Sequence, residues 1–331
     1  MLIHDYLALT KPRIVSLLTF SGVGAYFAAG GRSFLSLLAL TGSLALVAGS
    51  ASVINCYYDR HIDKKMERTR QRPLPAGRIS PVNALAYANI LLAIGLSLAS
   101  FFLTRGTLSW LLFGFLAYVV LYTILLKRRH WLGVVLGGSA GSFPVLAGWA
   151  AVNPVGTSAL SMALFVFAWT PAHAWVLEFV FREQYDRADI PTYPVVSSPD
   201  ETARGVWWAA WFTLFSAVPL LFFTGPFYAG LYLTGTPMFL LGYFPFVQTP
   251  NKPNAVLAFF TANMYLTLLF LGWAIDGFLG HPDDLILWVS AALTPMVFIA
   301  MWRARPSLGP VPASQPWKPA SVIPVHSTST E

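Results

Sequence analysis

Charged residues are scarce in this chain. Of its 331 residues, 11% are Asp, Glu, Lys or Arg, whereas 56% are hydrophobic. Soluble domains carry about 25% charged residues, so the composition excludes an ordinary soluble fold. Several uncharged runs reach the roughly 20 residues that a helix needs to cross the hydrocarbon of a bilayer. The sequence therefore predicts an all-α, polytopic membrane bundle surrounded by lipid.

Cysteine is almost absent as well. The single thiol, Cys56, excludes an internal disulfide and a thiolate metal cluster, and the interpretation it favours is a small buried apolar residue. The N-terminal segment carries an acid, Asp5, and has no short apolar core before a small-residue cleavage site. We therefore expect no removable signal peptide and a first helix that is retained.

The uncharged stretches predict about nine or ten transmembrane helices around a central cavity. The long run from 205 to 251 is divided at 224–226, because Thr-Gly-Pro punctuates helices. The predicted spans are 14–30, 34–57, 82–104, 108–126, 131–152, 158–180, 206–223, 227–247, 255–275 and 285–301.

Two long charged loops, 58–81 and 181–205, each follow the second helix of a set of four. This spacing predicts a transmembrane domain over 1–304, built from two four-helix halves, roughly 9–130 and 131–250, and further C-terminal helices. Residues 305–331 are rich in Pro, Ser and Thr and lack apolar periodicity, which is typical of a disordered tail.

Basic residues lie almost entirely on one side of the predicted bundle. Of the 21 Lys and Arg residues, only Arg32 and Arg105 fall on the opposite side. Because basic loops stay in the cytoplasm during insertion, we expect both termini and both long loops to be cytoplasmic. Topology and a phosphate site account for the net charge of +7, so no nucleic-acid partner is expected.

One polar motif stands at the end of the second predicted span. Asn55, Asp59 and Asp63 follow one another at intervals of four, which places them on one face of a helix. Acids beside an apolar helix cost free energy unless something neutralises them. Magnesium takes one or two protein carboxylates and completes its shell with water and phosphate oxygens. The motif therefore predicts a Mg²⁺ site for a phosphorylated substrate.

A basic segment follows the motif directly and is suited to binding a diphosphate and stabilising it as it leaves. Its members are Lys64, Lys65, Arg68, Arg70, Arg72 and Arg78. The alternative is a solvated loop whose charges only fix the topology. The spacing of the two aspartates favours the functional interpretation.

These segments resemble the UbiA-type intramembrane prenyltransferases, and most closely the branch that farnesylates heme. The matches run in order from residue 9 to about 276. They are LTKPRI at 9–14, NCYYDRHID at 55–63, RT at 68–69 with RPLPAGRI at 72–79, YT at 122–123 with LKR at 126–128, GGSAG at 137–141, GWAA at 148–151, WTPAH at 169–173, and IP at 190–191 with PVV at 194–196.

The resemblance implies transfer of a farnesyl group from farnesyl diphosphate to a vinyl group of heme B, giving heme O and diphosphate, in the cell (inner) membrane. It also implies heme A synthase or terminal oxidase assembly factors as candidate partners. Carried over by position, Asp59 and Asp63 would hold Mg²⁺ with support from Asn55. The residues that would bind phosphate oxygens are Arg68, Arg72, Lys127 and Arg128, with Lys11 as a further candidate.

The acceptor side carries fewer signals. His173 is the one histidine well inside an apolar stretch, and the resemblance makes it a heme contact, although a hydrogen-bonded structural histidine is the alternative. In the second loop, Glu183 and Tyr185 are candidate binding residues. The chain departs from the family at Gln184, where an acid is usual, at Gly133, where an Asn is usual, and at Ala174, where a Phe is usual.

Two other classes of function stay open from the sequence. The first is a prenyltransferase with another acceptor, a quinone-precursor aromatic or a lipid alcohol. The second is a transporter or a non-catalytic heme protein. Transport sites tend to lie at the bilayer midplane, whereas the charges here gather at one surface, which favours the enzyme.

Overall fold

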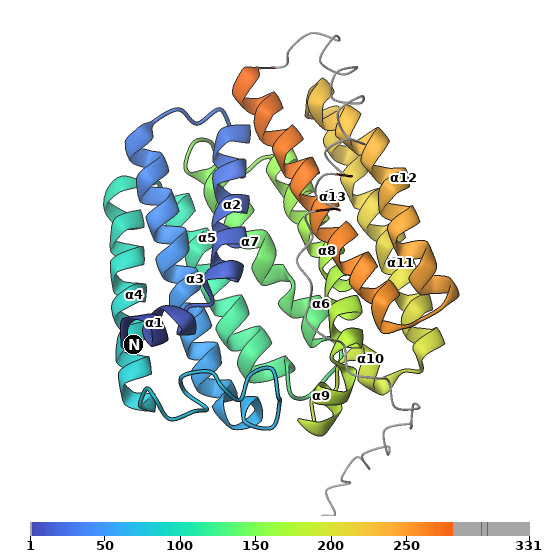
Figure 1. Ribbon diagram of the computed structural model, residues 1–331. Helices are drawn as coiled ribbons and strands as arrows, with labels where there is room; N and C mark the ends of the chain where they lie inside the picture. The colour runs from blue at the N-terminus through green and yellow to red at the C-terminus, as the bar shows by residue number, and fades with distance from the viewer. Residues whose placement is uncertain (1, 281–298, 300–302, 304–331) are drawn as a thin grey trace, which may run out of the picture.

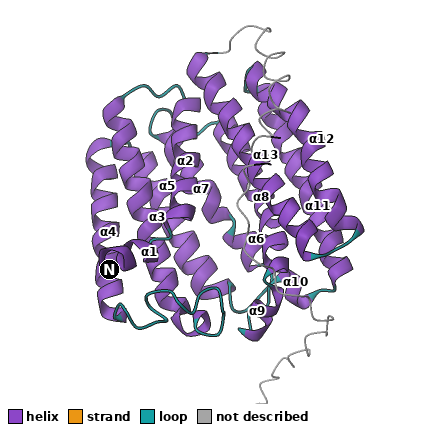
Figure 2. Cartoon of the chain, in the orientation of Figure 1, coloured by secondary structure: helices purple, strands orange, loops and turns teal. Residues whose placement is uncertain are grey.

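The computed structural model describes residues 2–280 together with 299 and 303, and every regular element in this part of the chain is helical (Figures 1 and 2). The first half contains α1 (Leu2–Leu9), α2 (Pro12–Ala28), α3 (Phe34–Asp63), α4 (Pro81–Phe102), α5 (Arg105–Leu116) and the π-helix η1 (Ala117–Leu126). Then come α6 (Gly133–Gly137), α7 (Ser139–Ala150), α8 (Thr157–Val180), α9 (Arg182–Arg187), α10 (Tyr193–Val196), α11 (Pro199–Ala217), the 3-10 helix η2 (Val218–Phe222), α12 (Pro226–Gln248) and α13 (Lys252–Leu279).

The predicted all-α polytopic architecture is confirmed. Among the described residues, seven helical stretches are long and apolar enough to cross a membrane: α3, α4, α5 with η1, α6 with α7, α8, α11 with η2, and α13. Two further helices, α2 with 17 residues and α12 with 23, occupy the predicted spans 14–30 and 227–247. The predicted tenth span, 285–301, lies almost entirely outside the described residues, and the tail 305–331 lies wholly outside them.

Side-chain caps set where several of these helices begin. Ser33, Ser80 and Thr104 each accept a hydrogen bond from the backbone N–H three residues later, at the starts of α3, α4 and α5. Ser198 and Glu201 form a reciprocal capping box at α11. The four N–H groups left free at a helix start need such partners, so the capping residues fix the first turn.

The helices close into one bundle because α13 packs against α2 as well as against α8 and α12. The largest apolar core surrounds α8, α11, α12 and α13 and includes Phe165, Tyr228, Phe239 and Tyr265. On the other side of the bundle, an apolar cavity of about 240 Å³ opens among α2, α3, α5, η1, α6, α7 and α8. The connection 64–80 and the segment holding α9 and α10 lie at the same end of the bundle (Figure 1).

Candidate active site

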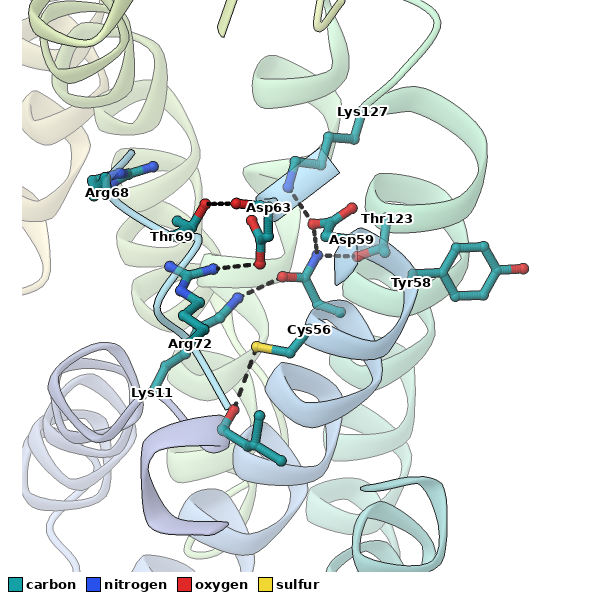
Figure 3. A network of polar contacts seen from close by, with 12 residues as sticks. Lys11, Cys56, Tyr58, Asp59, Asp63, Arg68, Thr69, Arg72, Thr123 and Lys127 are labelled. Carbon is teal, nitrogen blue, oxygen red and sulfur yellow. Dashed lines mark hydrogen bonds and ion pairs between the residues drawn. The ribbon is translucent and has the colours of Figure 1, made fainter. Parts of the chain in front are cut away.

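The motif predicted from the sequence forms a buried polar face at the end of α3. Asn55, Asp59 and Asp63 expose 2%, 1% and 4% of their surface. As expected from their spacing, the three side chains have partners in η1 and in the connection after α3. Asn55 contacts Thr123 of η1, and Asp63 pairs with Arg72 of that connection, as Figure 3 shows for Asp63. Because α3 runs on to Asp63, the last two acids stand on a rigid helix rather than on a loop.

Asp59 is held between two cations that follow η1. Lys127 Nζ bonds to Asp59 Oδ2, and Arg128 Nη2 lies 3.4 Å from Asp59 Oδ1. Arg128 also donates to the backbone carbonyl of Tyr58. Burial lowers the pKa of Lys127, but the charge and hydrogen bond of Asp59 outweigh it and raise that pKa above its usual value. Lys127 therefore stays charged.

The amide of Asn55 is fixed by three partners. Its Nδ2 donates to Asp59 Oδ2 and to Thr123 Oγ1, each at 3.0 Å, while its Oδ1 accepts from Lys11 Nζ at 2.5 Å. Lys11 has a φ of 53° and directly precedes Pro12. A left-handed conformation is uncommon for a lysine, and such backbone outliers gather at functional sites.

Asp63 is engaged by the connection that follows α3. Arg72 Nη1 donates to Asp63 Oδ2 at 3.0 Å, and Thr69 Oγ1 donates to the Asp63 backbone carbonyl at 2.9 Å. These bonds turn the basic segment back over the end of α3 (Figure 3). The cations predicted to bind phosphate are thereby brought to the predicted metal ligands.

The two long connections touch each other through Arg68. Its backbone N–H donates to Gln184 Oε1 at 3.2 Å, its Nη2 donates to Tyr185 Oη at 3.3 Å, and its guanidinium lies 4.7 Å from the centre of the Phe181 ring. Gln184 thus accepts a hydrogen bond here. An exposed ion pair between Lys65 and Asp189, at 2.7 Å, joins the same two segments.

Glu183 has a different kind of partner from the other predicted site residues. Its Oε1 pairs with Lys252 Nζ at the start of α13, at 3.2 Å. The Glu183 side chain is 36% exposed, whereas Lys252 is only 12% exposed. In this arrangement Glu183 ties the second connection to α13.

A π-helical segment, which the sequence pattern does not predict, aligns Thr123 and Lys127 with α3. The Lys127 N–H donates to the Tyr122 carbonyl at 2.9 Å, five residues back. Such segments are rare and recur at functional sites. Gly137 on α6 allows Tyr122 to pack closely, because a Cβ there would lie 2.4 Å from the Tyr122 ring.

The donor set fits a magnesium–diphosphate complex better than a metal ion held by protein alone. No group of three or more His, Cys, Asp or Glu side chains within the described residues could hold a metal ion. Magnesium that is bound with a phosphorylated substrate needs only one or two carboxylates. Asp59 and Asp63 supply those two, and the cations around them, Lys127, Arg128 and Arg72, could pair with phosphate oxygens instead.

His173 lies on α8 between two aromatic rings. The centre of its ring is 4.1 Å from that of Trp169 and 4.6 Å from that of Phe259 on α13. Its Nδ1 lies 3.4 Å from the Asn263 amide nitrogen, and Nε2 has no hydrogen-bond partner among the described residues. The stacking fixes the ring plane. Trp169 also lines the apolar cavity, so it links His173 to that cavity.

Comparisons with known proteins identify relatives. Residues 17–269 match the UbiA prenyltransferase family. A protein named protoheme IX farnesyltransferase, from Trichormus variabilis, is 36% identical over 282 residues, which cover 83% of this chain and 88% of the relative.

Two solved structures share the fold. A digeranylgeranylglyceryl phosphate synthase has a TM-score of 0.69 and 19% identity over 83% of this chain and 98% of its own. A UbiA homolog from Archaeoglobus fulgidus, bound to DMAPP and Mg²⁺, has a TM-score of 0.63 and 17% identity over 83% of this chain and 99% of its own. These structures show the same helical architecture.

Proposed function

The chain belongs to the UbiA prenyltransferase family, and we propose that it transfers a farnesyl group from farnesyl diphosphate to a vinyl group of heme B, giving heme O and diphosphate. It is a multi-pass membrane protein and a prenyltransferase. The proposal rests above all on one arrangement: two buried carboxylates among basic side chains, on helices that also line an apolar cavity.

The donor half of the site follows from charge. Asp59 and Asp63 would hold Mg²⁺. The UbiA homolog that was solved with DMAPP and Mg²⁺ supports this assignment. When bound, the ion would stabilise the negative charge on the departing diphosphate. Arg72, Arg68 and Lys127 would pair with phosphate oxygens, and Asn55 would orient Asp59 through its hydrogen bond of 3.0 Å.

The apolar cavity suits the farnesyl chain. Leu44, Val47, Leu111 and Phe143 are among the side chains that line it. When the bond between farnesyl C1 and oxygen breaks, an allylic cation forms, which water would quench. A cavity with apolar walls keeps water away, and the aromatic rings of Tyr118 and Trp169, which also line it, would stabilise a cation.

The acceptor half rests on His173 and on the name of the relative. Trp169 and Phe259 hold the imidazole in one plane, and Asn263 contacts its Nδ1. A ring positioned by such partners suits contact with a heme. Asn263 Nδ2 also donates to the Phe259 carbonyl at 2.8 Å, which fixes the orientation of the amide. When Nδ1 accepts from this amide, the neutral imidazole carries its proton on Nε2.

Placement in the cell follows the distribution of basic residues. We place the enzyme in the cell (inner) membrane with both termini and the active-site connections in the cytoplasm, because Lys and Arg gather on that side. Its heme product would pass to heme A synthase or to terminal oxidase assembly factors. The division into two four-helix halves stays a prediction.

A panel of acceptors tests the proposal. Detergent-purified protein is incubated with farnesyl diphosphate and Mg²⁺ and, in separate reactions, with heme B, an aromatic acid of the quinone-precursor type and a lipid alcohol. Extracts are analysed by chromatography with mass detection. We expect hydroxyethylfarnesyl addition to heme alone. A prenylated aromatic acid or lipid with unmodified heme would move the acceptor away from heme, and no product with any acceptor would overturn the proposal.

A further inference from the structure

A buried carboxylate on α8 lacks a partner. Glu178 is 6% exposed, and its Oε2 has no hydrogen-bond partner among the described residues. Buried polar atoms in proteins are nearly always bonded, and an acid within a membrane helix is costly. Within the described residues, neither a cap nor an ion pair accounts for Glu178, so this carboxylate is available to a bound polar molecule.

A second unpartnered atom belongs to a residue near Glu178. Thr192, between α9 and α10, is also 6% exposed, and its Oγ1 has no partner within the described part of the chain. Glu178 and Thr192 both line a small cavity of about 10 Å³. That volume is about what one water molecule requires when polar groups surround it.

Two residues of the proposed diphosphate site also line the small cavity. Lys127 lines it and also binds Asp59, while Tyr185 lines it and also accepts from Arg68. Tyr122 and His130 are the other titratable groups around it. A water molecule there would lie between a buried carboxylate and the cations of the donor site.

We propose that Glu178 is a catalytic base that binds one water molecule and accepts its proton during hydration of the prenylated vinyl group. This step rests on the proposed function. The farnesyl C1–O bond breaks and its electron pair leaves with diphosphate. The π electrons of the vinyl group form the new bond to C1, which leaves a cation on the vinyl carbon next to the porphyrin ring. The water oxygen then bonds to that carbon, and one water proton passes to the Glu178 carboxylate.

The cation has a competing fate that makes the role of Glu178 measurable. If no activated water attacks, the cation can lose a proton from the neighbouring carbon, which gives an alkene one water lighter than the hydroxylated product. A base that accepts a proton from the bound water favours attack by that water and therefore formation of the alcohol. A residue that merely stabilised the fold would change the total yield without changing this ratio.

Three variants test the step in the full-length protein. Glu178→Gln keeps the shape and removes the base, Glu178→Asp keeps a carboxylate, and Glu67→Gln is a matched control because Glu67 is 72% exposed. Reactions with heme B, farnesyl diphosphate and Mg²⁺ are run in ¹⁸O-labelled water, and mass detection resolves the two heme products. Diphosphate release is followed in parallel to report ionisation of the donor.

We expect labelled alcohol from the wild type, and a fall of about 100-fold in its rate of formation in Glu178→Gln, the range of general base catalysis. The alkene share should rise, diphosphate release should persist, and Glu178→Asp should restore part of the alcohol. An unchanged product ratio in Glu178→Gln, whatever the yield, overturns the assignment. Absence of any heme product from the wild type instead overturns the proposed function and this step with it.

Discussion

Lys127 Nζ bonds directly to Asp59 Oδ2, although the two residues lie 68 positions apart in the sequence. Asp59 is 1% exposed and Lys127 is 17% exposed, so this ion pair is shielded from water. Breaking a buried pair by removing one partner costs about 3–5 kcal/mol, because the other charge is left uncompensated. The pair therefore links the stability of the site to its ability to bind diphosphate.

Replacing Lys127 should affect both properties. We expect Lys127→Ala to lower the free energy of unfolding by about 3 kcal/mol and to weaken farnesyl diphosphate binding, because only Arg128 would then face Asp59. Lys127→Arg should retain most of both. Arg129→Ala is the control, since Arg129 is exposed. Thermal unfolding in detergent and substrate titration measure the effects, and equal behaviour of Lys127→Ala and Arg129→Ala would refute this role.

The same pair predicts how stability depends on pH. The pKa of Lys127 is raised in the folded chain, because the charge and hydrogen bond of Asp59 outweigh burial. The contribution of the pair is therefore complete below the usual lysine pKa and is lost as the pH rises through the raised value. Unfolding of Lys127→Ala and the wild type should differ by a constant amount from pH 6 to 9, and a difference that vanishes within that range would contradict the pairing.

Arg72 should matter more than its neighbour Arg70. Arg72 donates to Asp63 at 3.0 Å, whereas Arg70 is 58% exposed and lies 4.0 Å from Glu67. A hydrogen bond to a charged group contributes about 1.5–3 kcal/mol. We therefore expect Arg72→Ala to reduce kcat/KM for farnesyl diphosphate by about 10- to 150-fold, with Arg70→Ala near the wild type. Steady-state kinetics with both variants decide the point, and equal losses would argue for a general charge effect.

The ion pair that joins the two connections should contribute little by itself. Lys65 and Asp189 are 51% and 74% exposed, and exposed pairs contribute about 0–1 kcal/mol. Lys65→Ala and Asp189→Asn should each lower the unfolding free energy by less than about 1 kcal/mol, because asparagine tolerates the left-handed backbone of Asp189, whose φ is 56°. A loss of several kcal/mol in calorimetry would show that this contact organises the site.

The apolar cavity should limit the length of the prenyl chain. Ala140 lines the cavity, whereas Ala86 lies on an exposed face of α4. Ala140→Leu adds three carbon atoms to the cavity wall and should lower the kcat/KM ratio of farnesyl to geranyl diphosphate by about 10-fold, roughly 1.4 kcal/mol. Ala86→Leu should leave the ratio unchanged. If both variants keep the wild-type ratio, the cavity does not bind the prenyl chain.

Local patterns in the sequence were sufficient to predict the helices and the acidic motif. Uncharged runs marked the spans, and the interval of four placed Asn55, Asp59 and Asp63 on one face. The predicted helix boundaries were less accurate where charged residues lie within a helix. The first turn of α11 holds Asp200 and Glu201, so that helix begins at Pro199 and not at 206. In the same way α3 continues past 57 to Asp63.

The contacts between distant segments could not be predicted from one sequence. Thr123 contacts Asn55 from the π-helix η1, and no periodicity in the sequence predicts a π-helix there. Glu178 is the only charged residue inside the first eight predicted spans. Its unpartnered oxygen and its neighbour Thr192 depend on how the second connection folds against α8. The same holds for Gln184, which receives the Arg68 N–H.

The most direct test of the account compares the wild type with Asp59→Asn in one assay of farnesyl transfer to heme B, with Mg²⁺ and with chelator. Asp200→Asn, an exposed acid on α11, is the control. We predict product from the wild type and the control only when Mg²⁺ is present, and a loss of at least about 100-fold in folded Asp59→Asn, because charge stabilisation at the leaving group is removed. Equal product from Asp59→Asn and the wild type would contradict the role assigned to this carboxylate and the site built around it.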